Sequence, residues 1–398
     1  MKKFLRSILS QEVINYFYHR PIAYLANIYY GFPTRGLKVI GVTGTDGKTT
    51  TTNMIYQILK AAGKKVSMIS TINAAVGGKN YDTGFHVTSP SPFMVQKFLK
   101  QAVENGDEYM VLEVTSHALD QHRFAGVNFD IGVITNITHE HLDYHKSFGN
   151  YVKTKLKLIE NTKFAVINSN LKGDITQMVN SRVTFGIEKG DFNQQDIKLK
   201  LKIPGDYNIE NALAAMAVVY ILGIDRSTSQ KALENFTGLT GRMEEVKNNL
   251  GIKIIIDFAH TPNALENVLA TLRTKSSGRL IALIGCEGLR DVGKREMMGQ
   301  IAQRLSDIVI VTAVDPRGQI KEINRQITQG ARKEGAKDGI NFFVIEDRKE
   351  AINFAINKLA KKEDLVGIFG KGHEQSINLD GKKEIVWSDR EIVEETLL

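Results

Sequence analysis

The sequence predicts an α/β fold in which a mostly parallel, doubly wound sheet is followed by a smaller Rossmann-like domain. Three observations point to it. Short β-branched runs alternate with amphipathic stretches of helical period, the alternation restarts after residue 241, and 398 residues exceed one ordinary domain. We expect three parts: a short helical segment over residues 1–36, a central domain over 37–240 and a C-terminal domain over 241–398.

The first alternation is defined by valine- and isoleucine-rich runs and by stretches with apolar residues every three or four positions. The expected strands are Leu37–Val42, Val66–Ile69, Tyr109–Val114, Ile131–Asn136, Ala165–Asn168 and Val183–Phe185. The expected helices are Thr49–Ala62, Pro92–Asn105 and Ile209–Leu222. Because helices connect most of these strands, we expect them to pair in parallel.

The second alternation begins after a boundary near residues 236–246. Its expected strands are Lys253–Asp257, Leu280–Gly285, Ile308–Thr312, Asn341–Ile345 and Leu365–Phe369. Its expected helices are Asn263–Thr274, Lys294–Arg304, Ile320–Gly335 and Arg348–Leu359. The shorter span predicts the smaller of the two sheets.

The N-terminal segment is basic at its start and apolar over Ile22–Tyr30. That run is too short to cross a bilayer, and no small-residue cleavage site follows it, so we expect neither a transmembrane helix nor a signal peptide. Two interpretations remain. The segment forms an amphipathic helix on a membrane surface, or it packs on the next domain, which we favour.

The composition is that of a globular protein, with 42% hydrophobic and 24% charged residues. One cysteine, Cys286, excludes a disulfide framework and fits a reducing cytoplasm. The net charge of +8 admits nucleic acid, a membrane surface or an anionic substrate as partner. We find no aromatic-basic motif of a nucleic-acid module, so we expect a monomer that binds anionic small molecules and no nucleic acid.

The strongest single motif lies between the first expected strand and the first long helix. A glycine-rich turn there lets backbone N–H groups surround phosphates at a helix N-terminus. Lys48 would reach the β- and γ-phosphates, and the Thr49 hydroxyl would ligate Mg²⁺. The strict P-loop pattern G-x-x-x-x-G-K-[ST] needs a glycine at position 42, but the preceding glycine is Gly41. The expected phosphate-binding residues are Gly44, Thr45, Asp46, Gly47, Lys48, Thr49 and Thr50.

Further motifs follow this loop in order. They are LEVTSHAL at 112–119, TNIT at 135–138, HLDYH at 141–145, GDYNIEN at 205–211, GRME at 241–244, DFAHTP at 257–262 and GKGHE at 370–374. From about residue 37 to the end, the series resembles the Mur ligase family. The resemblance is to the branch that adds the third residue of the peptidoglycan stem peptide. It therefore implies a P-loop ATPase as the central domain.

The resemblance implies an ATP-dependent, Mg²⁺-requiring ligase that makes an amide bond through an acyl phosphate. Lys48, Glu113, His141 and a carbamylated Lys155 are the catalytic residues that it implies. Thr49, Glu113, His141 and Lys155 would hold the metal. Asn208, Asn211, Arg242, Asp257 and His260 would complete the ATP site. Taken alone, Lys155 could equally be a solvated helix lysine, and Glu113, at the end of an expected strand, a capping group.

Two substrate sites follow from the same resemblance. Thr88, Ser89, Thr115, Gln121 and Arg123 match positions that hold a muramoyl-dipeptide acceptor. Arg290, Asp315, Arg317, Gly370 and Glu374 match positions that hold the incoming amino acid. An arginine at 317 favours meso-diaminopimelate over L-lysine, whereas Val314 and Leu289 depart from the family pattern and leave that choice open.

The largest departure is at the front, where about forty residues precede the phosphate loop instead of roughly a hundred. The S-D-x-R-x-G-x-x-F motif of a UDP-binding domain is absent there. We therefore also consider a lipid-linked or other non-UDP acceptor. A folylpolyglutamate-synthase-like ligase and a non-catalytic scaffold are further alternatives. The HLDYH and GKGHE motifs disfavour the first, and intact Lys48 and Glu113 disfavour the second.

Overall fold

The computed structural model describes residues 11–81, 89–160, 162–171 and 181–398. The chain folds into two compact units. The first contains residues up to 137, 147–202 and 206–236, and the second contains 138–146, 203–205 and 237–398. Among the described residues, no helix is both long and apolar enough to cross a membrane.

The first unit is built on a nine-stranded sheet. In spatial order its strands are β4 (Lys79–Tyr81), β3 (Ala74–Val76), β2 (Val66–Ile69), β5 (Tyr109–Glu113), β1 (Lys38–Thr43), β6 (Ile131–Ile134), β7 (Phe164–Asn168), β8 (Arg182–Gly186) and β9 (Phe192–Asn193). All neighbours pair in parallel except at the β2–β3–β4 edge, which is antiparallel. The expected doubly wound sheet is confirmed.

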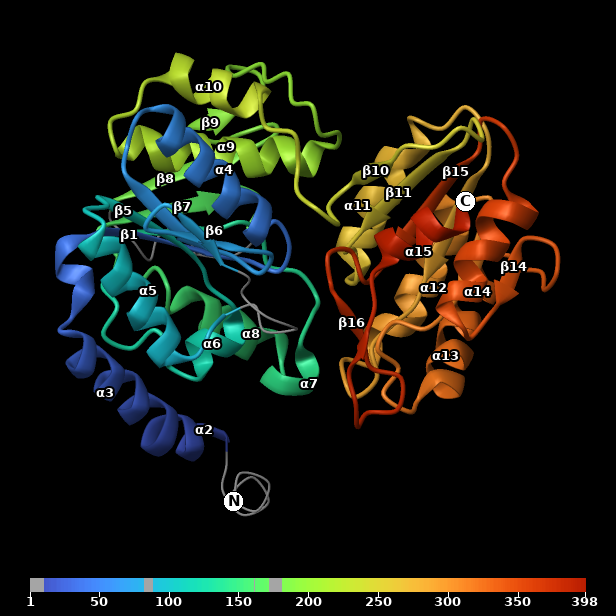
Figure 1. Ribbon diagram of the computed structural model, residues 1–398, viewed down its shortest axis with the longest axis horizontal. Helices are drawn as coiled ribbons and strands as arrows, with labels where there is room; N and C mark the ends of the chain where they lie inside the picture. Colours follow the sequence, from blue (N-terminus) through green and yellow to red (C-terminus); the bar gives the residue numbers. More distant parts are fainter. Residues whose placement is uncertain (1–10, 82–88, 161, 172–180) are drawn as a thin grey trace. The chain divides into compact units, whose positions relative to one another are not determined.

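Helices cover both faces of this sheet, with α4, α9 and α10 on one side and α5, α6 and α8 on the other (Figure 1). The helical elements are α2 (Gln11–Ile14), the π-helix η1 (Asn15–His19), α3 (Arg20–Tyr30), the 3₁₀-helix η2 (Pro33–Gly36), α4 (Lys48–Ala61), α5 (Pro92–Glu104), α6 (Ser116–Asp120), α8 (Phe148–Leu156), α9 (Asp206–Ile221) and α10 (Arg226–Glu234). The N-terminal segment therefore forms helices, and α3 packs against α5.

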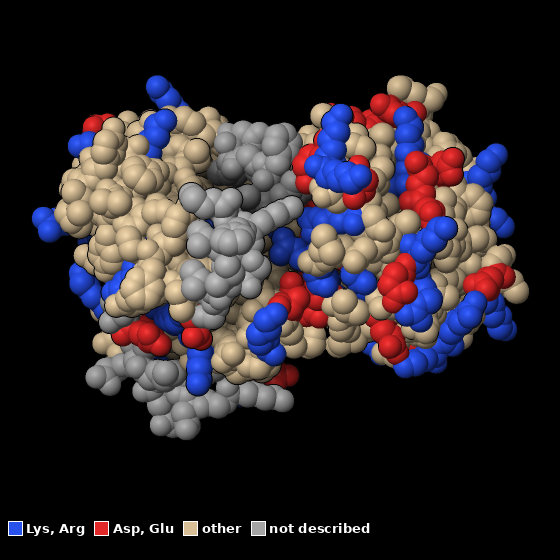
Figure 2. Space-filling model, turned by 90° about the horizontal axis from the view of Figure 1, so that it is seen from below, with Lys and Arg blue, Asp and Glu red and all other residues tan. Residues whose placement is uncertain are grey.

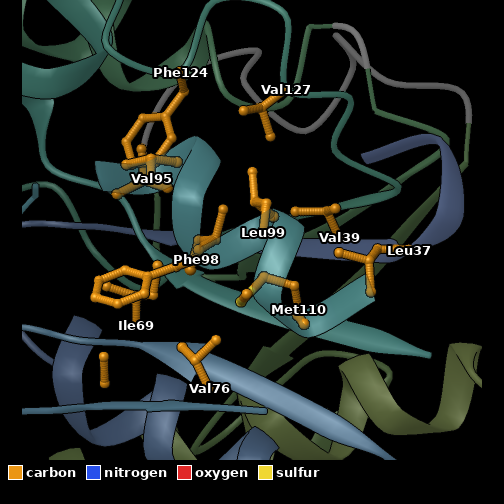
Figure 3. Packing of buried hydrophobic residues seen from close by; sticks show 14 of the residues in the cluster. Leu37, Val39, Ile69, Val76, Val95, Phe98, Leu99, Met110, Phe124 and Val127 are labelled. Carbon is orange, nitrogen blue, oxygen red and sulfur yellow. The ribbon is translucent and has the colours of Figure 1, made fainter. Parts of the chain in front are cut away.

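A core beneath α5 fixes the strands that carry the site. Its members come from α5, from β1, β2, β3 and β5, and from the loop after α6 (Figure 3). Val39, Leu99 and Met110 are fully buried there. Burying a side chain of this size stabilises the fold by about 1.5–3 kcal/mol. Because β1 and β5 are neighbours in parallel register, Val42 pairs with Glu113 and their carboxyl ends lie at one edge.

The second unit has a six-stranded sheet in the order β10 (Glu244–Val246), β11 (Lys253–Asp257), β15 (Leu365–Phe369), β12 (Leu280–Ile284), β13 (Ile308–Val311) and β14 (Phe342–Val344). Only β10 is antiparallel to its neighbour. Its helices are α7 (Leu142–His145), α11 (Pro262–Arg273), α12 (Gly293–Leu305), α13 (Ile320–Lys333), α14 (Arg348–Asn353), the π-helix η4 (Phe354–Leu359) and α15 (Asp389–Thr396). A short hairpin joins β16 (Ser376–Ile377) to β17 (Ile385–Val386).

Candidate active site

The turn between β1 and α4 has a shape that only glycine allows at two positions. Gly47 caps α4 with φ at +81°, in the left-handed region. A Cβ on Gly47 would lie 2.3 Å from Asn211 Oδ1, and one on Gly44 would lie 1.8 Å from Thr135 Oγ1. The backbone at Gly44 and Gly47 therefore leaves no room for a side chain.

Two residues after β6 hold this turn in place. The Thr135 hydroxyl donates to Asp46 O at 2.6 Å, and the Asp46 N–H donates to Asn136 Oδ1 at 2.9 Å. The Thr45 N–H donates to Asn136 O at 2.9 Å. The turn is thus fixed by the neighbouring parallel strand before α4 begins, and the N-terminal dipole of α4 favours an anion at this point.

Glu113 lies at the end of β5, beside the start of α4. Thr49 Oγ1 lies 3.0 Å from each carboxylate oxygen of Glu113, and the Thr71 N–H donates to Glu113 Oε2 at 2.8 Å. The Glu113 side chain is buried, which leaves its charge in need of compensation. A hydroxyl and a carboxylate next to a phosphate-binding turn form the hard-oxygen set that Mg²⁺ uses, with phosphate and water as its remaining ligands.

Two lysines contact the same turn. Lys48 Nζ donates to Thr45 O at 2.7 Å, and Lys155 Nζ, on α8, donates to Gly44 O at 2.6 Å. Lys155 is buried and lies over the Tyr151 ring, 4.5 Å from its centroid. The Tyr151 hydroxyl lies 3.1 Å from Thr45 Oγ1. Lys155 is therefore not a solvated helix lysine, although its carbamylation stays a prediction.

The first two turns of α9 bring two predicted ATP-binding residues to the same place. Asn208 and Asn211 are buried, and Asn211 Oδ1 accepts from the Thr51 hydroxyl at 3.2 Å. Between them, burial raises the pKa of Glu210, and hydrogen bonds from Asn168 and Asn170 oppose that rise only in part. In the described part of the chain, no group of three or more His, Cys, Asp or Glu side chains could hold a metal by itself.

A second cluster forms around the start of α6. The Ser89 and Thr115 hydroxyls lie 3.1 Å apart, and Arg123 donates to Ser89 O at 2.6 Å. Arg123 also donates from Nε and Nη2 to Gln121 Oε1, at 3.0 and 2.8 Å. Four of the five predicted acceptor-binding residues therefore form one network, while Thr88 lies outside the described residues.

In the second unit, three predicted ATP-binding residues lie near the carboxyl end of β11. Asp257 accepts the Met243 N–H at 2.7 Å, and the Arg242 guanidinium lies 4.5 Å from the centroid of the Phe258 ring. His260 Nδ1 lies 3.0 Å from Phe258 O. Arg242 and His260 thus flank the Phe258 ring. Asp257 lies next to it at the carboxyl end of a parallel strand, the usual position for a ligand in such sheets.

His141 belongs to the short 138–146 segment that packs with the second unit. Glu140 Oε1 lies 3.1 Å from Lys294 Nζ and 3.7 Å from His141 Nδ1, and the Leu142 N–H donates to Asp291 Oδ2 at 3.3 Å. Burial acts to lower the pKa of Lys294, but its acidic neighbours outweigh burial and hold that pKa above its usual value. His141 remains a predicted metal ligand.

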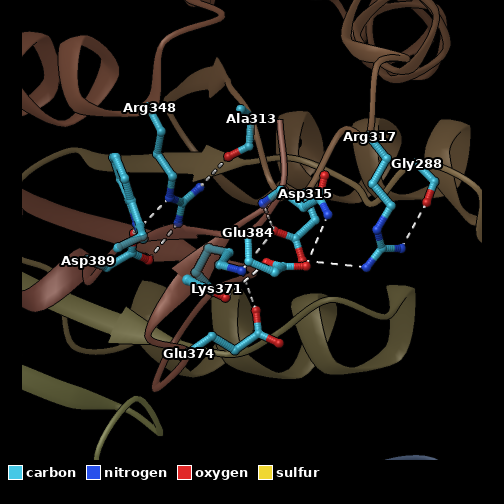
Figure 4. Close-up of polar contacts among 12 residues, drawn as sticks. Gly288, Ala313, Asp315, Arg317, Arg348, Lys371, Glu374, Glu384 and Asp389 are labelled. Atoms are coloured by element: carbon cyan, nitrogen blue, oxygen red, sulfur yellow. Dashed lines mark hydrogen bonds and ion pairs between the residues drawn. The ribbon is translucent and has the colours of Figure 1, made fainter. Parts of the chain in front are cut away.

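The predicted amino-acid site is a charged cluster between two loops (Figure 4). Lys371 is fully buried, and its Nζ lies 3.0 Å from Asp315 Oδ1 and 2.5 Å from Glu374 Oε2. Arg317 donates to Gly288 O at 3.0 Å and lies 3.6 Å from Asp315 Oδ2. The cluster thus pairs two cations with two carboxylates.

Arg290 acts on the same region through Glu287. Burial acts to raise the pKa of Glu287, but Lys294, His260, Arg290 and Arg317 outweigh it and lower that pKa to about 2. The neighbouring cations therefore favour the ionised form of Glu287.

The two departures from the family pattern differ in their environment. Val314 is buried, and a Cβ on Gly370 would lie 2.9 Å from its Cγ2, so Val314 supports the loop that carries Glu374. Leu289 is exposed with φ at +57°. Val314 therefore takes part in core packing, whereas Leu289 does not.

Comparison with known proteins decides the family. Residues 42–219 match the Mur ligase middle domain, and residues 241–372 match the Mur ligase, glutamate ligase domain. The UDP-N-acetylmuramoyl-L-alanyl-D-glutamate–2,6-diaminopimelate ligase of Clostridium botulinum is 38% identical over 403 residues, covering 95% of this chain and 81% of the relative. The chain belongs to the Mur ligase family.

Solved structures of Mur ligases and their relatives share this fold. A UDP-N-acetylmuramoyl-L-alanyl-D-glutamate–2,6-diaminopimelate ligase superposes with a TM-score of 0.58 at 28% identity, covering 91% of this chain and 78% of that one. E. coli FolC in complex with DHPP and ADP gives a TM-score of 0.69 at 19% identity, covering 87% and 89%. The second likeness concerns the fold alone. The prediction of a ligase of the Mur ligase family is confirmed.

In this Mur ligase, each unit assembles its own share of the predicted site residues. The first unit groups the phosphate turn with Glu113, Lys155 and the α9 asparagines. The second groups the β11 loop and the amino-acid cluster. Sequence reasoning missed Lys371 and Tyr151 as site residues. Lys371 lies between the two glycines of the GKGHE motif, directly after an apolar strand, and this position was the available signal in the sequence. Tyr151 had no comparable signal.

Proposed function

We propose that this Mur ligase joins a diamino acid, with meso-diaminopimelate favoured, to the glutamyl carboxylate of a muramoyl dipeptide. The observation that carries the ligase chemistry is the Thr49–Glu113 pair beside the phosphate turn. The choice of substrates is supported by relatives at 36–38% identity that are named 2,6-diaminopimelate ligases. The product is a tripeptide precursor of peptidoglycan.

The amino-acid preference is supported by Arg317. Its guanidinium is held by Gly288 O and faces Asp315, so its plane is oriented before any ligand arrives. A guanidinium pairs bidentately with a carboxylate. Diaminopimelate has a carboxylate at its distal end and lysine does not, so Arg317 favours the former. Glu374 would accept the distal ammonium group.

The first chemical step transfers the γ-phosphoryl group of ATP to an oxygen of the glutamyl carboxylate, and ADP leaves. Lys48 and the backbone N–H groups of residues 44–47 balance charge on the phosphates. Thr49 and Glu113 would hold Mg²⁺, with His141 and a carbamylated Lys155 as its predicted further ligands. Bound Mg²⁺ neutralises charge on the phosphates.

The second step makes the amide. The amine attacks the acyl carbon, the C–O bond to phosphate breaks, and inorganic phosphate leaves. Ser89, Thr115, Gln121 and Arg123 would hold the acceptor so that its carboxylate faces the phosphate turn. Orientation of this kind supplies a large part of the rate enhancement in two-substrate reactions.

We also propose that the enzyme is a cytoplasmic monomer whose N-terminal segment contacts the membrane peripherally. The single buried cysteine fits a reducing compartment.

A substrate screen tests the assignment. Phosphate release would be measured with UDP-linked or lipid-linked muramoyl dipeptide and with meso-diaminopimelate, L-lysine or L-glutamate. Folate plus glutamate would be a separate arm. We expect turnover to require both a muramoyl dipeptide and a diamino acid. Turnover with folate and glutamate alone, or phosphate release without any amine, would contradict the proposal.

A further inference from the structure

Helix α3 carries apolar side chains on two opposite faces. Ala23 and Ala26 are fully buried against the rest of the first unit. Leu25, Ile28 and Tyr29 point away from it and are 58%, 62% and 75% exposed. A surface helix ordinarily places polar residues on its outer face. The outer face of α3 therefore lacks the polar residues that water would favour.

The exposed apolar surface of α3 extends to aromatic rings on neighbouring elements. Arg20 lies over the Tyr16 and Tyr24 rings, at 5.2 and 5.8 Å from their centroids. Tyr29 contacts Phe93 at the start of α5, with 6.1 Å between ring centroids. We call this surface the outer aromatic face. It consists of Tyr16, Phe17, Tyr24, Leu25, Ile28, Tyr29, Phe93 and Met94, all more than 40% exposed.

Basic residues outnumber acidic ones in the sequence of the N-terminal segment. Residues 1–36 contain five lysines or arginines and one acidic residue, Glu12. Figure 2 shows the side of the molecule on which α2 and α3 lie, and there the visible surface of the first unit is mostly uncharged. Tyrosine rings favour the level of lipid headgroups, and basic residues near them favour anionic lipid. A combination of aromatic, aliphatic and basic residues with few acids is typical of helices that lie on membranes.

We propose that the outer aromatic face docks this protein on an anionic lipid bilayer, with α3 lying in the plane of the headgroups. Eleven residues of helix are about 16 Å long, which is half of what is needed to cross the hydrocarbon core. The arrangement therefore places Leu25, Ile28 and Tyr29 in the boundary layer. Arg20 remains near the lipid phosphates, because its long side chain lets the charged end stay in water.

Docking also orients the predicted acceptor cluster, a consequence that rests on the proposed function. Asn15 donates to Asp120 Oδ2 at 2.6 Å, and Asn27 donates to Ala125 O at 2.6 Å. These contacts tie the N-terminal helices to both ends of the loop that carries Gln121 and Arg123. The acceptor cluster would then lie close to the bilayer, which suits a muramoyl dipeptide whose carrier is anchored in lipid.

Vesicle sedimentation tests the docking. The full chain would be mixed with vesicles of phosphatidylglycerol and phosphatidylcholine, or of phosphatidylcholine alone, at low and high salt. The test variant is Leu25→Gln/Ile28→Gln/Tyr29→Gln. The matched control is Ile340→Gln/Val344→Gln/Val386→Gln, which removes three exposed apolar side chains from the second unit. Thermal unfolding would show that both variants fold, and Leu25→Gln alone serves if the triple variant does not.

We expect the unmodified chain and the control to bind the anionic vesicles, more weakly at high salt. The test variant should bind at least ten-fold less. Absence of binding by the unmodified chain, or equal binding by the test variant, would overturn the proposal. Light scattering after gel filtration would identify a second copy as the occupant. A dimer that the test variant dissociates would also overturn it.

Turnover assays distinguish a failure of membrane docking from a failure of the proposed function. With soluble UDP-linked dipeptide, the test variant should keep its activity, because none of its residues lies in the site. With lipid-linked dipeptide in anionic vesicles, its activity should fall at least ten-fold. Vesicle binding without ligase activity in any variant would contradict the proposed function and leave the docking intact.

Discussion

At the scale of single residues, Glu113 is the proposed Mg²⁺ ligand at the end of β5. Its carboxylate already accepts a hydroxyl and a backbone N–H, so a glutamine there keeps its size and part of its hydrogen bonding. Glu113→Gln removes the negative charge that Mg²⁺ needs. We expect kcat to fall by about 10²–10³-fold, the usual effect of losing one transition-state contact.

The matched control for this change is Glu104→Gln on the exposed end of α5, where the carboxylate lies 3.5 Å from Lys100 in a solvated pair. It should leave the rate of phosphate release unchanged. If Glu113→Gln turned over as fast as the control, Glu113 would have no part in holding the metal.

Lys155 provides a second test at this scale. Carbamylation requires carbon dioxide and a neutral amine, and the modified side chain is an anion. We expect activity to fall when bicarbonate is removed and to return when it is added. Lys155→Ala should lower activity by at least about a hundred-fold, by analogy with the loss of an electrostatic contact. Lys153→Ala, on the exposed side of α8, should behave as the unmodified enzyme. Bicarbonate-independent turnover would contradict carbamylation.

Cys286 gives a prediction with a defined dependence on pH. Burial raises the pKa of the Cys286 thiol to about 12, well above its value in an unfolded chain. At pH 8 the folded protein therefore presents a protonated thiol, which is a poor nucleophile. We expect a thiol reagent to leave Cys286 unmodified in buffer and to react with it in urea. Rapid labelling of the folded chain at pH 8 would contradict its burial.

At the scale of elements, a buried ion pair connects α14 and α15 to the two loops of the charged cluster. Arg348 donates to Asp389 through Nε and Nη2, each at 2.7 Å. It also donates to Ala313 O at 3.2 Å and to Phe369 O at 3.0 Å, just before the loops that carry Arg317 and Glu374. Figure 4 shows this pair beside the charged cluster.

Removing the arginine leaves a buried carboxylate and two loops without their anchor. We expect Arg348→Ala to lower the free energy of unfolding by about 3–5 kcal/mol. It should also raise KM for the amino acid more than KM for ATP. Arg332→Ala breaks an exposed pair with Asp338 and should cost under about 1 kcal/mol in urea denaturation. Equal effects of the two changes would contradict the anchoring role.

The helices and strands differ in how closely the sequence predicted their bounds. Long parallel strands such as β5 and β15, and amphipathic helices such as α11, were predicted to within two residues, because periodicity and caps define them. The β3–β4 hairpin and β10 were missed, since three-residue antiparallel edge strands have almost no periodicity. The buried state of Lys371 was also missed, because it depends on Asp315, 56 positions away.

At the scale of the whole molecule, motif order predicted the family and both sheets. The sequence did not predict that residues 138–146, expected in the central domain, would group with the C-terminal part of the chain. Residues 138–146 belong to the second unit although they lie between parts of the first in the sequence. Local pattern could not indicate this, because the segment is held by Lys294 and Asp291, about 150 positions away.

Isotope transfer tests directly whether the glutamyl carboxylate is activated as an acyl phosphate. The glutamyl carboxylate of the dipeptide would be labelled with oxygen-18, and the phosphate released with the diamino acid would be examined by mass spectrometry. We expect one labelled oxygen in each phosphate, and no transfer with Lys48→Ala. Tripeptide formation with the label absent from phosphate would contradict it.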